Sequence, residues 1–352
     1  MTKKLNIAII LKEGCSYKWQ SEIIDELCDN EFVSIKSVLL VENAKAKQLI
    51  SLSTLLSKIS HFFFFVHQRL DELLFSDNNS LMRFCKPKKW VKSIRKIDLS
   101  KSEISLETLF KHLDLVLMFD PIKLENEILD IPKYGIWDLT CHNVDLNIKC
   151  LPGYWELVDH APELITNLEM LGADGQSKIL YQSSQITDYF SIYKNQQNHL
   201  KRLKLITLRV IQKLSEQGES YFSDQLKLHN RALEEAKDGL LAMPDLFDSI
   251  KNQLLHIRFL IKDSFLKLIY SDYWFVLINT EKSIDAFGGF GEFKPIDSPK
   301  DRFWADPFVI SRNARHYVFV EELLFELGRG RISCIEIGDN GEVLNSSIVL
   351  EK

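Results

Sequence analysis

The sequence has few of the signals that mark metal or disulfide chemistry. Its six cysteines are scattered, and none is paired in the Cys-x-x-Cys spacing of a zinc knuckle. No His-x-Glu or His-Glu-x-x-His motif is present either. We therefore expect no metal site and no disulfide framework, and the scattered thiols predict a reducing, cytoplasmic location.

Net positive charge and long apolar runs are also missing. The formal net charge is -5 at pH 7, so no overall basic field attracts nucleic acid. The basic runs at residues 86–92 and 199–204 are interpreted as solvated faces, with a phosphate-binding patch as the alternative. The aromatic run His61–Val66 is too short to span a bilayer, and the apolar start of the chain has the length of a strand. The sequence predicts no nucleic-acid partner, no transmembrane segment and no signal peptide.

Nucleotide and hydrolase motifs are absent as well. The glycine-rich segment Phe287–Glu292 follows no predicted parallel strand and opens no helix, so it does not indicate a P-loop. No strand-to-helix elbow with a nucleophilic serine is present. The chemistry must therefore come from other residues.

What the sequence does contain is a long α/β pattern followed by strands. Its 352 residues are 45% hydrophobic and 26% charged, which suffices for two packed domains. Leu5–Leu11 is continuously apolar, as in a strand buried on both faces, and Phe32–Val41 predicts a second strand after an intervening helix. The four phenylalanines of Phe62–Phe65 are expected in the core. Further strands are predicted at Leu113–Asp120, within Lys133–Leu139, at Thr166–Met170 and at Ile179–Gln182.

Three domains follow from these elements. We expect an α/β domain over residues 1–195, with a mostly parallel open sheet and helices on both faces. Residues 196–270 have helical periodicity and predict a helical connector. Residues 271–352 predict an all-β meander, with Asp339-Asn340-Gly341 as a turn signal after the strand Ile332–Ile337.

The centre of the first domain carries a specific order of motifs. The strand Leu113–Phe119 is followed by a short helix, by Gly135-Ile136-Trp137, by Leu151-Pro152 and by Gly172-Ala173-Asp174-Gly175. This order resembles the formyltransferase fold of methionyl-tRNA, glycinamide ribonucleotide and sugar N-formyltransferases, over about residues 5–190. The resemblance implies that 10-formyltetrahydrofolate donates a formyl group to an amine. In that family an Asn and a protonated His stabilise the oxyanion, and an Asp orients the His.

The catalytic positions implied by the resemblance are altered in this chain. Counting from Gly135, the Asn position falls on Asp138 and the His position on Thr140, and His142 lies two residues further on. We take Asp138 and His142 as candidate catalytic residues and Thr140 as a candidate substrate-binding residue. An aspartate at an oxyanion position has the wrong charge unless it is protonated or turned away. The pattern therefore favours an altered or inactive site over intact formyl transfer.

Two further candidates come from the same resemblance. Asp174 takes the position of the loop aspartate and is the third candidate catalytic residue, and Pro152 of the Leu-Pro pair is a candidate substrate-binding residue. Alternatives stay open for both polar candidates. His142 can be a loop histidine with its own hydrogen bonds, and Asp174 can serve ordinary turn chemistry. Trp137 is interpreted as core rather than as a ligand-stacking surface.

The last block contains a charged interruption in an apolar strand. Asp306 and Pro307 divide the run Phe303–Ile310, and the next strand ends in Glu321-Glu322. This pattern resembles the first blade of the five-bladed β-propellers of glycan-handling proteins, including glucosamine inositolphosphorylceramide transferases. Asp306 and Glu322 are candidate carbohydrate-binding residues, although Asp306 can also be a turn residue paired with Arg302. Glu321 and Glu322 should face opposite sides of the strand.

The expected function combines both resemblances. One blade leaves its edges uncovered, so we expect either a fragment of a longer propeller protein or packing on the first domain. The leading interpretation is a formyltransferase-like protein of sugar or glycan modification that acts on an amino sugar or a nucleotide-sugar-like ligand. One alternative is an inactive carbohydrate-binding or scaffolding protein of polysaccharide biosynthesis. A third is a propeller protein associated with glycosyl transfer.

Overall fold

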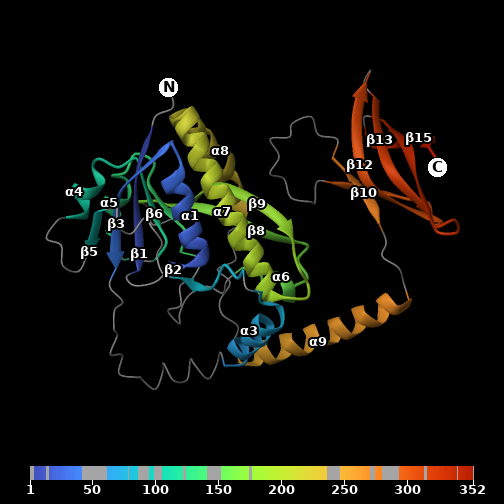
Figure 1. The fold of residues 1–352 in the computed structure, drawn as a ribbon, viewed down its shortest axis with the longest axis horizontal. Helices are drawn as coiled ribbons and strands as arrows, with labels where there is room; N and C mark the ends of the chain where they lie inside the picture. The colour runs from blue at the N-terminus through green and yellow to red at the C-terminus, as the bar shows by residue number, and fades with distance from the viewer. Residues whose placement is uncertain are drawn as a thin grey trace. The chain divides into compact units, whose positions relative to one another are not determined.

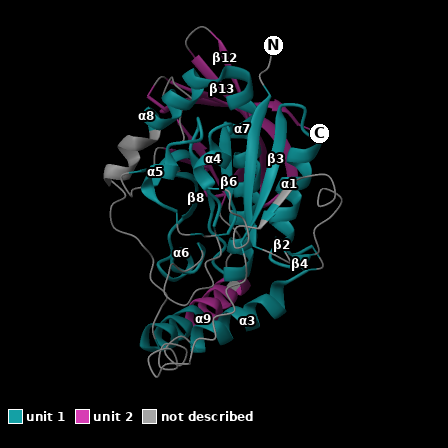
Figure 2. Cartoon of the chain, turned by 90° about the vertical axis from the view of Figure 1, so that its left-hand side faces the viewer, with its two compact units in different colours: residues 1–257 teal, residues 258–352 magenta. Residues whose placement is uncertain are grey.

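The computed structural model describes residues 4–12, 16–41, 62–77, 79–85, 95–98, 105–120, 122, 124–140, 152–173, 177–235, 246–269, 274–279, 293–312, 315–338 and 340–351. The chain divides into two compact units, Met1–Ile257 and Arg258–Lys352, which Figure 2 colours separately. None of the helices in these described ranges is both long enough and apolar enough to cross a membrane.

The first unit is built on a seven-stranded sheet in the order β5-β3-β1-β6-β7-β8-β9. The first five strands in that order pair in parallel, whereas β8 and β9 continue the sheet antiparallel. The prediction of a mostly parallel α/β sheet is confirmed. The strands are β1 (Leu5–Lys12), β3 (Val33–Val41), β5 (Arg95–Asp98), β6 (Leu115–Met118), β7 (Ile136–Asp138), β8 (Glu163–Leu171) and β9 (Ser177–Ile186).

Strand β1 is buried on both faces because its side chains alternate between two cores. Ile7 and Ile9 contact the core under helix α1 (Lys18–Asp29), together with helices α7 (Ile192–Gln217) and α8 (Glu219–Glu235). Ala8 and Ile10 contact the opposite core, formed with α4 (Leu106–Phe110) and α5 (Asn126–Leu129). Figure 1 shows these helices around the sheet. Each buried Leu or Ile contributes about 1.5–3 kcal/mol, so the apolar strand dictates this layered arrangement.

The strand order contains one reversal, and it lies at β1. The chain moves from β1 outward to β3 and β5, then returns to pair β6 with the other side of β1. The carboxyl ends of β1 and β6 therefore flank a topological switch point. Open α/β sheets bind their ligands in the crevice at such a point.

Several shorter elements complete the first unit. Strands β2 (Ser16–Tyr17) and β4 (Phe84–Cys85) form a small antiparallel pair, and α6 (Trp155–Val158) is a single turn. Helix α3 (Phe62–Phe75) contains the phenylalanine run, but only Phe64 is buried and the other three rings are exposed. The expectation that the whole run lies in the core was therefore wrong. Four consecutive positions point around most of a helix, so one flank can bury only part of them.

The second unit is antiparallel throughout its described strands. Strands β10 (Phe275–Ile278) and β11 (Lys294–Asp297) form one pair. Strands β12 (Arg302–Arg312), β13 (Arg315–Leu324), β14 (Arg329–Ile337) and β15 (Val343–Leu350) form a four-stranded meander in sequence order. A core that includes Trp304, Val320 and Ile335 joins the two sheets. The predicted all-β meander is confirmed, and the described strands form no closed barrel.

Candidate functional site

A carboxylate stands at the switch point of the parallel sheet. Asp120 follows the end of β6, and its Oδ2 accepts a hydrogen bond of 2.8 Å from the backbone N–H of Lys12, the last residue of β1. Burial raises the pKa of Asp120 above its usual value, and the hydrogen bond and charge of Lys12 partly offset that rise. Asp120 thus ties the two strands together at the edge where ligands bind in this fold class.

The adjacent strand ends in a second carboxylate, Asp138. Its Oδ1 accepts hydrogen bonds from the backbone N–H of Thr140 at 2.8 Å and from the Thr140 hydroxyl at 2.5 Å. Asp138 pairs in register with Met118, so it lies along the same carboxyl edge as Asp120. Thr140 donates its hydroxyl proton to Asp138. The pair therefore presents acceptors to a ligand, and neither side chain offers the donor that an oxyanion needs.

Helix α1 is fixed to this edge through Gln20. This buried side chain accepts from the N–H of Tyr17 at 2.9 Å and donates to the backbone oxygen of Phe119 at 3.5 Å. The first contact caps the helix, and the second connects its first turn to the residue before Asp120. The start of α1 is thus held against the end of β6.

The other sequence candidates of the first unit are placed only in part. His142 and Asp174 lie outside the described residues. Strand β8 runs antiparallel to β7, so its last residue, Leu171, pairs with Ile136 at the amino end of β7, whereas Asp138 pairs with Glu169. The end of β8 therefore lies at the opposite edge of the sheet from Asp138. Pro152 is half-buried and precedes Gly153, which packs on helix α7.

Gly153 packs so closely against Asn195 that no side chain fits at position 153. Its φ is +106°, and an added Cβ would lie 2.5 Å from the Cβ of Asn195. Asn195 is fully buried, and its Nδ2 donates to the backbone oxygens of Gly153 at 3.2 Å and Asp188 at 2.8 Å. The described segment around Gly153 is therefore locked onto the start of α7.

Replacing this glycine should destabilise the first unit. We expect Gly153→Ala to lower the free energy of unfolding by about 2–3 kcal/mol, since it adds a steric clash to an unfavourable φ. Gly218→Ala is the matched control: φ there is +65°, but nothing lies within 4 Å of the added Cβ. Urea denaturation should show a clearly smaller loss for the control. Equal losses would mean that Asn195 moves aside freely.

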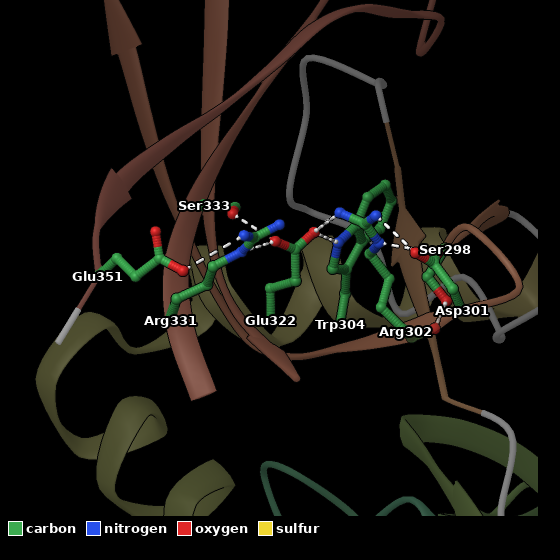
Figure 3. Close-up of polar contacts among 8 residues, drawn as sticks. All are labelled: Ser298, Asp301, Arg302, Trp304, Glu322, Arg331, Ser333 and Glu351. Atoms are coloured by element: carbon green, nitrogen blue, oxygen red, sulfur yellow. Dashed lines mark hydrogen bonds and ion pairs between the residues drawn. The ribbon is translucent and has the colours of Figure 1, made fainter. Parts of the chain in front are cut away.

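In the second unit, Glu322 forms a hydrogen-bonded network (Figure 3). It is 2% exposed, and its Oε1 accepts from Trp304 Nε1 at 3.0 Å and from Arg302 Nη1 at 3.1 Å. Its Oε2 accepts from Ser333 Oγ at 2.9 Å and from Arg331 Nε. The strand register explains this arrangement, because Glu322 is opposite Trp304 on one side and Arg331 on the other.

This network keeps Glu322 ionised. Burial opposes its ionisation, but hydrogen bonds from Trp304, Arg331, Ser333 and Arg302 outweigh that effect and lower the pKa to about 2. With both oxygens used, the carboxylate stabilises the sheet and has no proton to donate near neutral pH. Its neighbour Glu321 is exposed, so the prediction that the two face opposite sides is confirmed.

Asp306 lies at an irregularity of β12. Its φ is +47°, in the left-handed region that Asp tolerates better than most residues. Ala305 is opposite Glu321 and Phe308 is opposite Phe319, so Asp306 and Pro307 together oppose one residue and form a β-bulge. Arg302, the pairing partner considered for it, instead contacts Asp301 and Glu322. The bulge leaves Asp306 exposed.

Two cavities of the first unit lie away from the carboxyl edge. A cavity of about 330 Å³ is lined by residues that include Gln68, Tyr193 and Gln196, and one of about 260 Å³ by residues that include Asn6 and His112. Asp120 and Asp138 line neither of them. Among the residues that the structure describes, no three His, Cys, Asp or Glu side chains gather as a metal site.

The fold is an open, mostly parallel α/β sheet with two carboxylates along its carboxyl edge, followed by an antiparallel meander. A scan of the sequence against protein-family models found no match. A search of curated proteins found no relative. Sequence reasoning identified Asp138 and Thr140 at this edge but missed Asp120 and Gln20. The available signal for Asp120 was its position at the end of a predicted buried strand.

Proposed function

We propose that the first unit binds a small amine- and hydroxyl-bearing ligand, an amino sugar or a nucleotide-linked sugar, in the service of sugar or glycan modification. The observation that carries the proposal is the half-buried carboxylate of Asp120 at the switch point, which bridges β1 and β6. Asp138 adds a second carboxylate along the same edge. Carboxylates accept charge-assisted hydrogen bonds from amines and hydroxyls, which suits such a ligand.

The same residues do not fit the formyl group of 10-formyltetrahydrofolate. Its developing oxyanion needs donors, and Asp138 with Thr140 presents a carboxylate at the implied position. We therefore favour a carbohydrate-binding or scaffolding role and derive no transfer step. Formyl transfer to an amino sugar is the second proposal. It is supported by the chain order β6, α5, β7, which is the order that the resemblance implies, with β6 and β7 adjacent in the middle of the sheet.

The second unit supports a carbohydrate role in a weaker way. A four-stranded antiparallel meander has the composition of one propeller blade. We propose Asp306, exposed at its bulge, as the carbohydrate contact of this unit. Glu322 serves the sheet itself. Association with a glycosyl-transfer system is a third proposal that rests on the blade-like meander alone.

Calorimetry with variants of the carboxyl edge tests the leading proposal. With glucosamine and a nucleotide-linked amino sugar as probes, Asp120→Asn should weaken binding by about 10–100-fold, because a charge-assisted hydrogen bond contributes about 1.5–3 kcal/mol. Asp130→Asn is the control, since Asp130 is exposed and lies before the amino end of β7. Unchanged binding by Asp120→Asn would contradict the assigned site.

The same titration separates the two leading proposals. A stable analogue of 10-formyltetrahydrofolate should produce no heat with the wild-type protein if the unit only binds carbohydrate. Binding of the analogue that His142→Ala abolishes would instead support formyl transfer.

A further inference from the structure

Helix α9 (Leu246–Ile269) buries polar side chains in its first half, which belongs to the first unit, and exposes apolar side chains along its length. Ser249, Asn252 and His256 are at most 8% exposed. Asn252 Nδ2 donates to the hydroxyl of Tyr154 at 3.2 Å, and His256 Nε2 lies 3.1 Å from the backbone oxygen of Tyr189. Surface helices normally have the reverse polarity. The outward face of α9 therefore suits a partner less polar than water.

The outward side chains form a continuous apolar stripe. They recur every three or four residues, so they lie along one side of the helix. Each is between 37% and 84% exposed. At 1.5 Å per residue the stripe is about 32 Å long. Its members are Phe247, Ile250, Leu254, Ile257, Ile261, Phe265 and Leu268.

The helix packed beside the first half of α9 is also apolar on its outside. Gln253 Nε2 donates to the backbone oxygen of Phe63 at 3.3 Å, and the rings of His67 and His256 lie 5.8 Å apart. Figure 1 shows α3 beside the start of α9. Six large apolar side chains of α3 are exposed: Phe62, Phe63, Phe65, Leu70, Leu73 and Leu74. Two neighbouring helices thus share the same unusual exposure.

One border of the stripe is positively charged. Lys251, Arg258 and Lys262 are exposed, and at 100° of rotation per residue they lie together beside the stripe. The acidic residues of α9 lie further round the helix, and Asp263 pairs with Lys267 at 3.1 Å. A partner on this face would meet apolar groups flanked by cations.

We propose that α9 lies in the plane of an anionic phospholipid membrane, with the apolar stripe among the acyl chains and the three basic residues at the lipid phosphates. This combination is what interfacial helices use. A second copy of α9 fits less well. If two α9 helices packed in parallel through the stripe, Lys251 and Arg258 would meet no acidic residue of the other helix. If the helices packed antiparallel, these two basic residues would face each other.

Vesicle flotation of the full chain tests this proposal. The protein should float with phosphatidylcholine vesicles that contain phosphatidylserine and bind pure phosphatidylcholine at least tenfold more weakly, since each basic residue near an anionic surface adds about 1 kcal/mol. The double variant Leu254→Gln/Ile261→Gln should lose at least tenfold in binding, because it removes apolar area. Leu205→Gln/Leu228→Gln, at exposed leucines of α7 and α8, is the matched control and should bind as the wild type.

A variant without the basic residues and a measurement of self-association complete the test. Lys251→Gln/Arg258→Gln/Lys262→Gln should bind anionic vesicles about tenfold or more weakly and lose the salt sensitivity of the wild type. Equal flotation of wild type and stripe variant would overturn the proposal. So would a wild-type dimer in sedimentation that the stripe variant converts to a monomer without any effect on vesicle binding.

Discussion

Glu322→Gln is expected to lower the stability of the second unit by about 3 kcal/mol. The wild-type carboxylate binds both Arg302 and Arg331 from a position that is 2% exposed. Glutamine keeps the shape but removes the buried charge between the two guanidinium groups, which retain only the more exposed carboxylates of Asp301 and Glu351. Removing one partner of such a buried network typically costs about 3–5 kcal/mol. The loss should appear in denaturation followed by hydrogen exchange of β13 and β14.

The pH dependence of this loss identifies its electrostatic origin. The folded-state pKa of Glu322 is about 2, below its ordinary value of 4.5. The carboxylate therefore stabilises the fold above pH 4.5, and that contribution disappears as the pH falls through about 2. The difference between wild type and Glu322→Gln should shrink over this window. Glu321→Gln, at the exposed neighbour, is the control. A difference that persists unchanged at pH 2 would contradict the network.

Trp137→Ala is expected to lower the stability of the first unit by about 3–5 kcal/mol. The indole is fully buried in the larger core of the sheet, and its Nε1 donates to the backbone oxygen of Tyr134 at 2.9 Å. Truncation removes apolar contacts and leaves a cavity beneath the carboxyl edge. Urea denaturation followed by hydrogen exchange of β1 and β6 measures the effect for this unit alone.

A second variant at the same position distinguishes packing from ligand stacking. Trp137→Phe keeps most of the apolar volume and loses the hydrogen bond, so its cost should be about 1–2 kcal/mol. If Trp137 instead stacked on a ligand, Trp137→Ala would abolish binding while leaving stability nearly unchanged. That outcome would contradict its assignment to the core.

The sheet could be predicted because its signal is local. The continuous apolar run of β1 can be buried only if helices cover both faces of the sheet, and Ile7 and Ile10 lie in opposite cores. The phenylalanine run of α3 was misjudged, because hydrophobicity alone does not say which flank of a helix is buried. Helix α9 shows the same limit: its periodic pattern fits either face inward, and the hydrogen bonds of Asn252 and His256 decide.

The site depends on contacts that sequence spacing cannot supply. Asp120 binds the N–H of Lys12, which is 108 residues away. Arg302 was considered as the partner of Asp306, but the register of β12 and β13 places Trp304 opposite Glu322 and brings Arg302 to that carboxylate. Register follows from the packing of whole strands. In contrast, the contact of Asp138 with Thr140 is local and could have been expected from the turn chemistry of Asp.

Hydrogen exchange with and without a nucleotide-linked amino sugar tests the ligand site most directly. We expect the sugar to slow exchange at Phe119, Asp120, Leu139 and Thr140, which follow β6 at the switch point and β7 beside it. Exchange at Asn6, Ser37 and His112, which line a cavity elsewhere in the first unit, should not change. Protection confined to those three residues, with no effect at Asp120, would contradict the proposed site.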